Sequence, residues 1–355
     1  MRYVRFLKTP RVTTEKNTSK SEVCCLITIT SDLGDSFLPY DIQLSAELLS
    51  SQPSEHILVW RTVQWTGGMR SLPVTFPLPK SRAKSPLRVR IGVEPKSLYD
   101  DYSKLANEGS RGIVSAWSAD FGAPVEAIRL IERRFMLPRG PKVHIWEETG
   151  ESIARHLWDA GITLSCHLID MLDDSSALSR AILPSQSRTQ LQILELGTGC
   201  GMVGITLAQV VGGANVLLTD LAEAQEIVEH NVKQVKTAKA SSLRFQELDW
   251  DQELPSNLLS SSSPLDLVLA ADCTYNSDSS PALVRTLARL AQVSPKVIVA
   301  IAMKMRHSSE EVFFGLMTKA AFEETTTITY HLPGDVEVGE ETVYLHVYHY
   351  IAGSR

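Results

Sequence analysis

Asp272 and Tyr275 follow an apolar run directly, in the stretch LVLAADCTYN at residues 267–276. The run suits the interior of a buried parallel strand. Ligands of an open parallel sheet bind beyond the carboxyl ends of its strands, so both side chains are expected beside a ligand. There the carboxylate can attract a cation, and the phenol can wall an aliphatic chain. The structural alternatives are that Tyr275 packs under a following helix and that Asp272 caps that helix with Thr274 and Asn276.

A second candidate site is the glycine-rich stretch LELGTGCGMVG at residues 194–204. Gly197, Gly199 and Gly201 alternate there, which lets the backbone pass close to a ligand with a positive φ. The helix expected to follow directs its amide hydrogens and its dipole at the same place. The last three glycines of the stretch also satisfy the dinucleotide fingerprint G-x-G-x-x-G. Taken alone, the glycines allow a nicotinamide site, a nucleoside-sulfonium site or a structural turn without a ligand.

Other features choose between these cofactors. Asp220, which ends NVLLTD, does not discriminate, because both cofactors have a ribose to bind. Glu195 completes E-x-G-x-G-x-G, the pattern of S-adenosylmethionine sites. The segment ELDW offers Asp249 as an acceptor for an adenine amino group, next to the flat ring of Trp250. A terminal antiparallel hairpin, described below, is typical of class I methyltransferases and absent from the usual dehydrogenase sheet. These features predict S-adenosyl-L-methionine as the cofactor.

Alternating helices and strands from about residue 150 must position these side chains, and this alternation is typical of a parallel α/β sheet. The last two strands leave no room for a helix between them and should pair as an antiparallel hairpin. We therefore predict an α/β fold of the class I methyltransferase type, a Rossmann-like seven-stranded sheet with an antiparallel last strand. The expected strands are 191–196, 215–220, 243–248, 265–270, 296–303, 322–330 and 341–351, and the expected helices are 149–172 (whole or broken), 202–211, 222–237, 276–293 and 307–320.

The first half of the chain differs in pattern, so we predict an N-terminal β-rich module at 1–140 and the methyltransferase domain at 141–355. Its short strands are rich in β-branched or aromatic residues and are separated by Gly, Pro and Ser. In LRVRIGV, Leu87, Val89, Ile91 and Val93 should share one face of a small sandwich or barrel. The segment VEAIRLIERRF is expected to form a helical connector. The expected strands are 21–30, 56–65, 71–78 and 86–95.

Composition places the protein in a broad class. Hydrophobic residues at 43% and charged residues at 21% are ordinary for a globular protein of 355 residues. No stretch reaches the roughly 18 apolar residues of a membrane span, and the N-terminus lacks the apolar segment of a secretory signal. Five cysteines without a CxxC pair indicate reduced thiols, and the histidines show no metal-ligand spacing. We expect a cytoplasmic, monomeric protein that binds neither metal nor membrane.

Charge is divided unevenly along the chain. Residues 1–140 hold 20 Lys+Arg and 14 Asp+Glu, a net +6, whereas residues 141–355 carry a net −12. The run KSRAKSPLRVR at 80–90 contributes five positive charges. It is interpreted either as a solvated strand edge or as a surface for an acidic protein or RNA. Direct nucleic-acid binding is not expected. The docking hypothesis is that this run binds the same substrate whose lysine enters the acidic half.

Five motifs together resemble a known family: HLWDAGITLSCHL, ILELGTGCGMVGI, LLTD, ELDW and LAADCTYN follow the order found in the seven-β-strand protein-lysine methyltransferases of family 16. The resemblance covers about residues 145–355. It implies a protein-lysine N-methyltransferase whose partner is a protein substrate, expected to be a translation elongation factor, with a chaperone as the other choice. The first 140 residues look like an added module, as in fungal elongation-factor methyltransferases.

The resemblance also implies roles for single residues. Asp220 would bind the ribose hydroxyls, and Trp250 would pack on the adenine with Asp249 close by. Asp272 and Tyr275 would form the D-x-x-Y motif, which stands where amide and base methyltransferases often carry N-P-P-Y. Here Asn276 follows the tyrosine and the motif has no Pro pair, a departure that favours lysine over glutamine or adenine as the substrate group. The other cofactor contacts would be Trp158, Gly197, Thr198, Gly199 and the backbone of Ala271.

Two alternatives to protein methylation stay open. One is a small-molecule N-methyltransferase of the nicotinamide type. The other is a binding module that retains the fold without catalysis, although the intact motifs from Trp158 to Tyr275 count against it. In the favoured interpretation, Asp272 receives and orients the lysine and Tyr275 walls its stem, without Asp272 acting as a strong base. Cys200 and Cys273 are expected to serve as small hydrophobic residues rather than nucleophiles.

Overall fold

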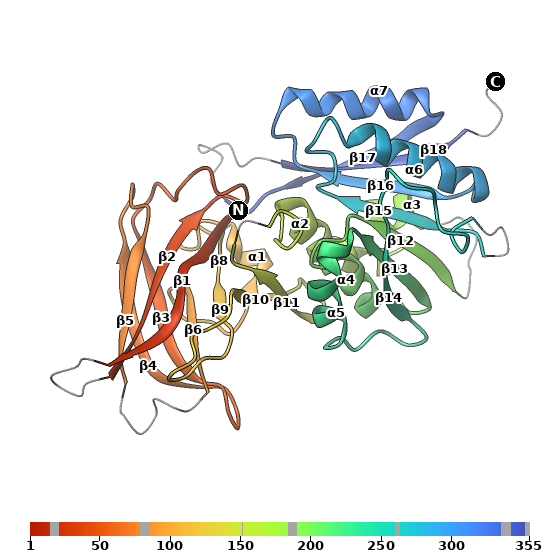
Figure 1. Ribbon diagram of the computed structural model, residues 1–355. Helices are drawn as coiled ribbons and strands as arrows, with labels where there is room; N and C mark the ends of the chain where they lie inside the picture. The colour runs from red at the N-terminus through yellow and green to blue at the C-terminus, as the bar shows by residue number, and fades with distance from the viewer. Residues whose placement is uncertain are drawn as a thin grey trace. The chain divides into compact units, whose positions relative to one another are not determined.

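A computed structural model describes residues 1–14, 21–78, 86–150, 152–183, 190–259, 263–334 and 342–351 (Figure 1). The chain divides into two compact units. The first comprises Met1–Met136, Lys142–His156 and Leu332–Glu341, and the second comprises Leu137–Pro141, Leu157–His331 and Thr342–Arg355. Strand β11 (Lys142–Glu148) lies in the first unit, beyond the boundary expected at residue 140, because it pairs along its whole length with β10 (Leu130–Met136).

The first unit consists of two sheets around one core. Side chains from both sheets meet in that core, so the unit is a β-sandwich. Leu87, Val89 and Ile91 are fully buried in it and Val93 packs against it, which confirms the predicted shared face. One sheet has the order β5 (Leu72–Leu78), β2 (Ser21–Thr30), β1 (Arg2–Thr14), β8 (Ile113–Val114). The other has the order β11, β10, β9 (Ala116–Ser118), β6 (Leu87–Val93), β3 (Ile42–Ser50), β4 (His56–Trp65), with β7 (Asp100–Asp101) paired to β10 and the short helix α1 (Tyr102–Leu105) following β7.

The helical connector predicted for residues 125–135 is wrong, because most of it is strand β10. The alternation of apolar and polar residues that identifies a strand is not visible here, because the charged residues Glu132, Arg133 and Arg134 are all buried. Arg133 stands between Ile131 and Phe135 and reaches Glu147 of β11 at 2.7 Å. A pattern read for apolar residues alone cannot recognise a strand whose inward side chains include a paired arginine.

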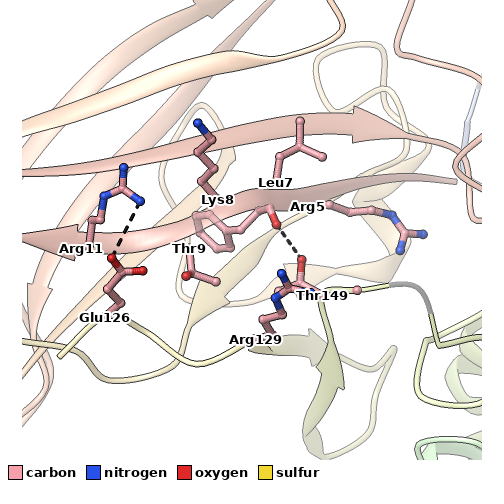
Figure 2. A pocket seen from close by; sticks show the side chains of 10 residues that line it. Arg5, Leu7, Lys8, Thr9, Arg11, Glu126, Arg129 and Thr149 are labelled. Carbon is pink, nitrogen blue, oxygen red and sulfur yellow. Dashed lines mark hydrogen bonds and ion pairs between the residues drawn. The ribbon is translucent and has the colours of Figure 1, made fainter.

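Strand β1 is irregular in its middle. Its register with β2 shifts between Phe6 and Lys8 and again between Lys8 and Arg11, so the strand carries two β-bulges. On its other side β8 pairs only with Arg2 and Tyr3. Side chains from this bulged stretch line a pocket in the first unit (Figure 2).

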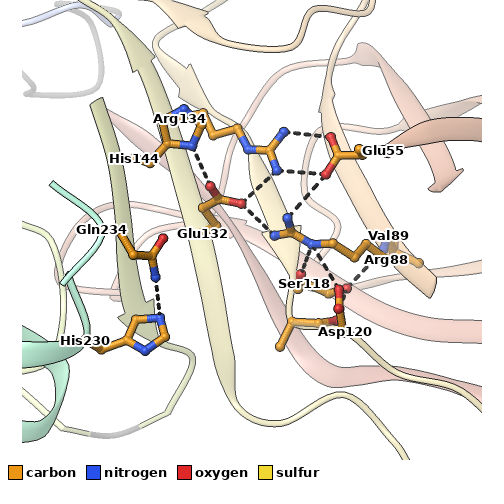
Figure 3. A network of polar contacts seen from close by, with 11 residues as sticks. Glu55, Arg88, Val89, Ser118, Asp120, Glu132, Arg134, His144, His230 and Gln234 are labelled. Atoms are coloured by element: carbon orange, nitrogen blue, oxygen red, sulfur yellow. Dashed lines mark hydrogen bonds and ion pairs between the residues drawn. The ribbon is translucent and has the colours of Figure 1, made fainter. Parts of the chain in front are cut away.

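A second polar feature of the first unit is a buried ion-pair network (Figure 3). Arg88 contacts Glu132 at 2.7 Å, and Arg134 bridges Glu132 and Glu55 at 2.7 to 2.8 Å. Burial alone would raise the pKa of Glu132, but hydrogen bonds from His144 and Arg134 and the charges of both arginines hold that pKa well below its usual range.

This network corrects the basic-run hypothesis. Arg88 is buried within it, and Arg90 is buried against Glu47 at 2.7 Å, so neither arginine presents its charge to a partner. The other three cations of the run, Lys80, Arg82 and Lys84, lie outside the described residues.

The second unit contains a single seven-stranded sheet, as predicted, and each of its seven strands begins and ends within two residues of the expected positions. Helices α6 (Ser280–Val293) and α7 (Val312–Lys319) pack on one face, with α2 (Asp159–His167), α4 (Met202–Val210) and α3 (Ala177–Ile182) on the other (Figure 1). The order is β14 (Ser242–Glu247), β13 (Ala214–Asp220), β12 (Leu191–Leu196), β15 (Leu267–Ala271), β16 (Ile298–Met303), β18 (Thr342–Tyr350), β17 (Phe322–His331), and α5 (Gln225–Val232) follows β13.

The predicted terminal hairpin is confirmed, since β17 and β18 pair antiparallel and β18 joins β16. The helix predicted for 149–172 is shorter: α2 begins at Asp159 and passes into a 3-10 turn at Leu168–Leu172, while 149–158 is not helical where it is described. No helix in the described ranges combines the length and the apolar character that a membrane span would need.

Candidate active site

The glycine loop connects β12 to α4 in the second unit. Gly197, Gly199 and Gly201 have φ values of 62°, 57° and 85°, a left-handed conformation in which side chains are strained. A Cβ on Gly197 would lie 2.5 Å from the sulfur of Cys273 and 3.3 Å from the ring of Trp250. The loop therefore needs glycine at 197 for space as well as for φ. The loop is fixed at its centre, where Thr198 N donates to Thr219 O at 3.0 Å.

Two carboxylates accept hydrogen bonds from this loop and from the helix that follows it. Glu195 is buried and accepts a hydrogen bond from Gly204 N in α4 at 2.8 Å. Asp220, at the end of β13, accepts from Gly199 N at 2.8 Å. Burial is the main reason why the pKa of Glu195 is raised to about 8, and burial also raises the pKa of Asp220. Glu195, expected as a cofactor contact, thus points at the helix, and we infer that it acts by holding the loop.

The raised pKa of Glu195 predicts a pH dependence of stability. Because the folded-state pKa of about 8 lies above the unfolded value of 4.5, its stabilising contribution is complete below pH 4.5 and is lost as pH rises to 8. Glu195→Gln keeps an acceptor for Gly204 N without a charge. We expect this variant to resist urea better than wild type at pH 8, by on the order of a few kcal/mol, and to lose that advantage at pH 5. Parallel pH profiles would contradict the assignment.

The residues expected to bind the adenine, Asp249 and Trp250, follow the end of β14 and lie near the glycine loop. Trp250 follows β14 and is partly buried, with its ring facing Gly197. Asp249 is partly exposed, and its carboxylate accepts from Asp251 N at 3.0 Å. Ala271 ends β15 and pairs with Ala302 of β16. The structure thus gathers the predicted residues of β12, β13, β14 and β15 at one sheet edge.

Asp272 is buried just beyond β15, with a left-handed φ of 55°. Its Oδ2 accepts from Ala160 N at 2.8 Å, and its Oδ1 lies 2.8 Å from Nη1 of Arg306. The structural alternative of capping the following helix is not observed, because the carboxylate bonds the first turn of α2 instead. Asp272 was expected to receive the cationic lysine of the substrate, but its carboxylate already pairs with the guanidinium of Arg306.

A second ion pair runs beside the first. Asp159 is fully buried and contacts Lys304 Nζ at 2.8 Å. Asp159, Lys304 and Arg306 were not among the predicted site residues. The same criterion that selects Asp272 would have found the two cations, since they follow the buried strand β16 just as Asp272 follows β15.

Trp158 is joined to this arrangement through its ring. It is the N-cap residue of α2, and the guanidinium of Arg306 lies 5.7 Å from its ring centroid. Arg306 therefore links Trp158 to Asp272. Both are expected site residues, although they stand far apart in the sequence.

Tyr275 is 51% exposed, so it does not pack as a core residue under α6. Partial burial raises the pKa of its phenol, and the nearby Cys273, Asp220 and Glu223 raise it further. Cys273 is buried, its Sγ 3.3 Å from Leu196 O, and burial raises the pKa of the thiol well above its usual value. This agrees with the expected role of a small hydrophobic residue.

These residues fit a nucleoside cofactor such as S-adenosylmethionine. The loop leaves no room for a side chain at Gly197, an aromatic ring faces it, and the carboxylate of Asp220 stands at the next strand end, bonded to Gly199 N. The model of the family described as lysine methyltransferase matches residues 138–320. The chain belongs to this family. This lysine methyltransferase therefore uses S-adenosylmethionine as its methyl donor.

Three relatives show how far the similarity of this lysine methyltransferase extends. The UPF0665 family protein C23C4.06c of Schizosaccharomyces pombe is 28% identical and spans 93% of this chain and 98% of its own. Protein N-lysine methyltransferase METTL21A of Danio rerio is 30% identical over 47% of this chain and 67% of its own. EEF1A lysine methyltransferase 3 of Mus musculus is 31% identical over 46% of this chain and 62% of its own.

Proposed function

We propose that this enzyme methylates a lysine side chain of a translation elongation factor. Its membership of the lysine methyltransferase family gives the reaction, and a relative named for EEF1A supports the substrate. The observation that carries the proposal is the placement of Asp272 and Tyr275 at the end of β15, next to the glycine loop, with Tyr275 half exposed.

The chemistry requires a neutral lysine amine in line with the methyl group that S-adenosylmethionine supplies when bound. Removing the proton of a free lysine at pH 7 costs roughly 4–5 kcal/mol. An aromatic wall lowers this cost by desolvating the amine. Tyr275 can provide such a wall, and the carboxylates of Asp220 and Glu223 that act on its phenol make the surroundings attractive to the incoming cation.

In this proposal Asp272 is a positioning residue. Its carboxylate is shared between Arg306 and the first turn of α2, so it fixes Trp158 relative to the end of β15. Alignment of the reacting groups accounts for much of the rate in such a transfer, because the leaving group is already good.

Methylation of purified elongation factor 1A tests the proposal. We expect wild type with labelled S-adenosylmethionine to transfer label to that protein, and mass spectrometry to place it on a lysine. Asp220→Ala should lose transfer, because Gly199 N loses its acceptor. The matched control Asp251→Ala removes an exposed carboxylate and should stay active.

Other outcomes identify the alternatives. Label in a different protein of a cell extract lacking the enzyme would replace the elongation factor as the substrate. Label in a soluble metabolite alone would favour the small-molecule enzyme. Cofactor binding without any transfer would leave the non-catalytic module.

A further inference from the structure

The pocket of the first unit has a volume of about 470 Å³ and lies along the bulged stretch of β1 (Figure 2). Four cationic side chains and one carboxylate line it, a net charge of +3; they are Arg5, Lys8, Arg11, Arg129 and Glu126. Arg11 and Glu126 form a long pair of 3.8 Å, and both are well exposed. The pocket is therefore a concentrated positive site in the first unit, whereas the proposed catalytic residues Asp272 and Tyr275 lie in the second unit.

Two hydrogen bonds tie strand β1 to the walls of the pocket. Thr149 Oγ1 donates to Phe6 O at 2.8 Å, and Ala127 N donates to Pro10 O at 3.0 Å. Between these ties, Leu7 and Thr9 have no residue opposite them in the described register with β2. The two hydrogen bonds thus hold the walls at both ends, and the bulges leave the strand unpaired with β2 between them.

Arg5 supplies a fixed charge at one end. Its Nη2 donates to Asp32 O at 2.8 Å, and its guanidinium lies 5.4 Å from the ring centroid of Tyr3. By contrast, the side chains of Lys8 and Arg129 are exposed and make no hydrogen bond or ion pair with any residue that the structure describes. Of the four lining cations, these two are the ones that no described residue pairs.

Exposed apolar side chains accompany the charged ones. Leu7 lines the pocket, and Val125 and Ile128 directly precede the lining residues Glu126 and Arg129; all three apolar side chains are more than half exposed. Phosphate or RNA would gain from the cations but not from these apolar side chains. A peptide with both acidic and apolar side chains would gain from both.

We propose that this pocket binds an extended acidic segment of the protein substrate, in which carboxylates alternate with apolar side chains. The inference rests on the proposed protein methylation and adds a docking site in the first unit. The carboxylates pair with Lys8 and Arg129, and the apolar side chains pack on Leu7 and Ile128. The basic half of the chain thus contributes to substrate affinity through β1 rather than through the buried arginines of β6.

Fluorescence anisotropy with a labelled peptide of six Glu-Leu repeats tests the site without methylation. Wild type should bind this peptide, and Lys8→Glu/Arg129→Glu should weaken binding at least tenfold with an unchanged melting temperature. The control Arg70→Glu/Lys96→Glu reverses the same charges at two other exposed positions of the first unit and should bind like wild type. With whole-protein substrate, the first double variant should raise KM at least tenfold and leave kcat unchanged.

Three results would overturn the proposal: no peptide binding by wild type, equal weakening by both double variants, or tighter binding of an RNA oligomer with the same sensitivity to Lys8 and Arg129. If the peptide binds as expected but no protein is methylated, the docking site stands and the proposed function fails. The two inferences are therefore tested separately.

Discussion

Asp272→Ala is expected to lower kcat/KM for methyl transfer roughly 100-fold and to destabilise the protein by roughly 3–5 kcal/mol. The change leaves the largely buried side chain of Arg306 without its carboxylate and Ala160 N without its acceptor. Alanine also tolerates the φ of 55° less well than aspartate does. Transfer kinetics and urea unfolding measure the two effects, and calorimetric titration with the cofactor product would show whether cofactor affinity falls as well.

Asp272→Asn separates charge from shape. Asparagine accepts the left-handed φ and can still accept from Ala160 N, so the change falls on the contacts of Oδ1 with Arg306 and with Lys304 N. A double-mutant cycle of Asp272→Asn with Arg306→Gln should show a coupling energy above about 1 kcal/mol. Additive effects would contradict the coupling of Asp272 with Arg306. Wild-type activity in Asp272→Ala would contradict any role of Asp272 in methyl transfer.

Gly197→Ala is expected to weaken cofactor binding at least about 100-fold, because its Cβ would stand between the thiol of Cys273 and the ring of Trp250. The φ of 62° adds backbone strain. Gly161→Ala is the matched control: it lies in α2, and the nearest atom to its Cβ is 4.0 Å away. It should bind the cofactor normally and raise stability slightly.

Adding Cys273→Ala to Gly197→Ala distinguishes the two causes. Removal of the sulfur relieves the contact but leaves the strain in φ, so part of the affinity should return. Full recovery would assign the loss to the contact alone, whereas normal binding by Gly197→Ala itself would show that this loop does not hold the cofactor.

Local pattern predicted much of the second unit. An apolar run followed by glycines or an acid identified β12, β13 and β15 with Gly197, Asp220 and Asp272 at their ends, because parallel strands are buried on both faces. The positive φ at the glycines follows from the same pattern. The sheet could be predicted since each of its strands carries its own signal.

Long-range pairing could not be predicted in this way. Asp272 is bonded to Ala160, 112 positions away, and Lys304 to Asp159, 145 positions away. Such partners depend on which strand ends meet in three dimensions rather than on any local spacing. The first unit was harder for a related reason, since charged residues such as Arg133 and Glu147 occupy inward positions and conceal the alternation of β10 and β11.

The connection between β17 and β18 belongs to the first unit, although both strands belong to the second. A boundary after His156 leaves Leu332–Glu341 with the second unit, so no single cut in the coding sequence yields both units whole. Separating the two units by engineering therefore requires more than one cut in the coding sequence.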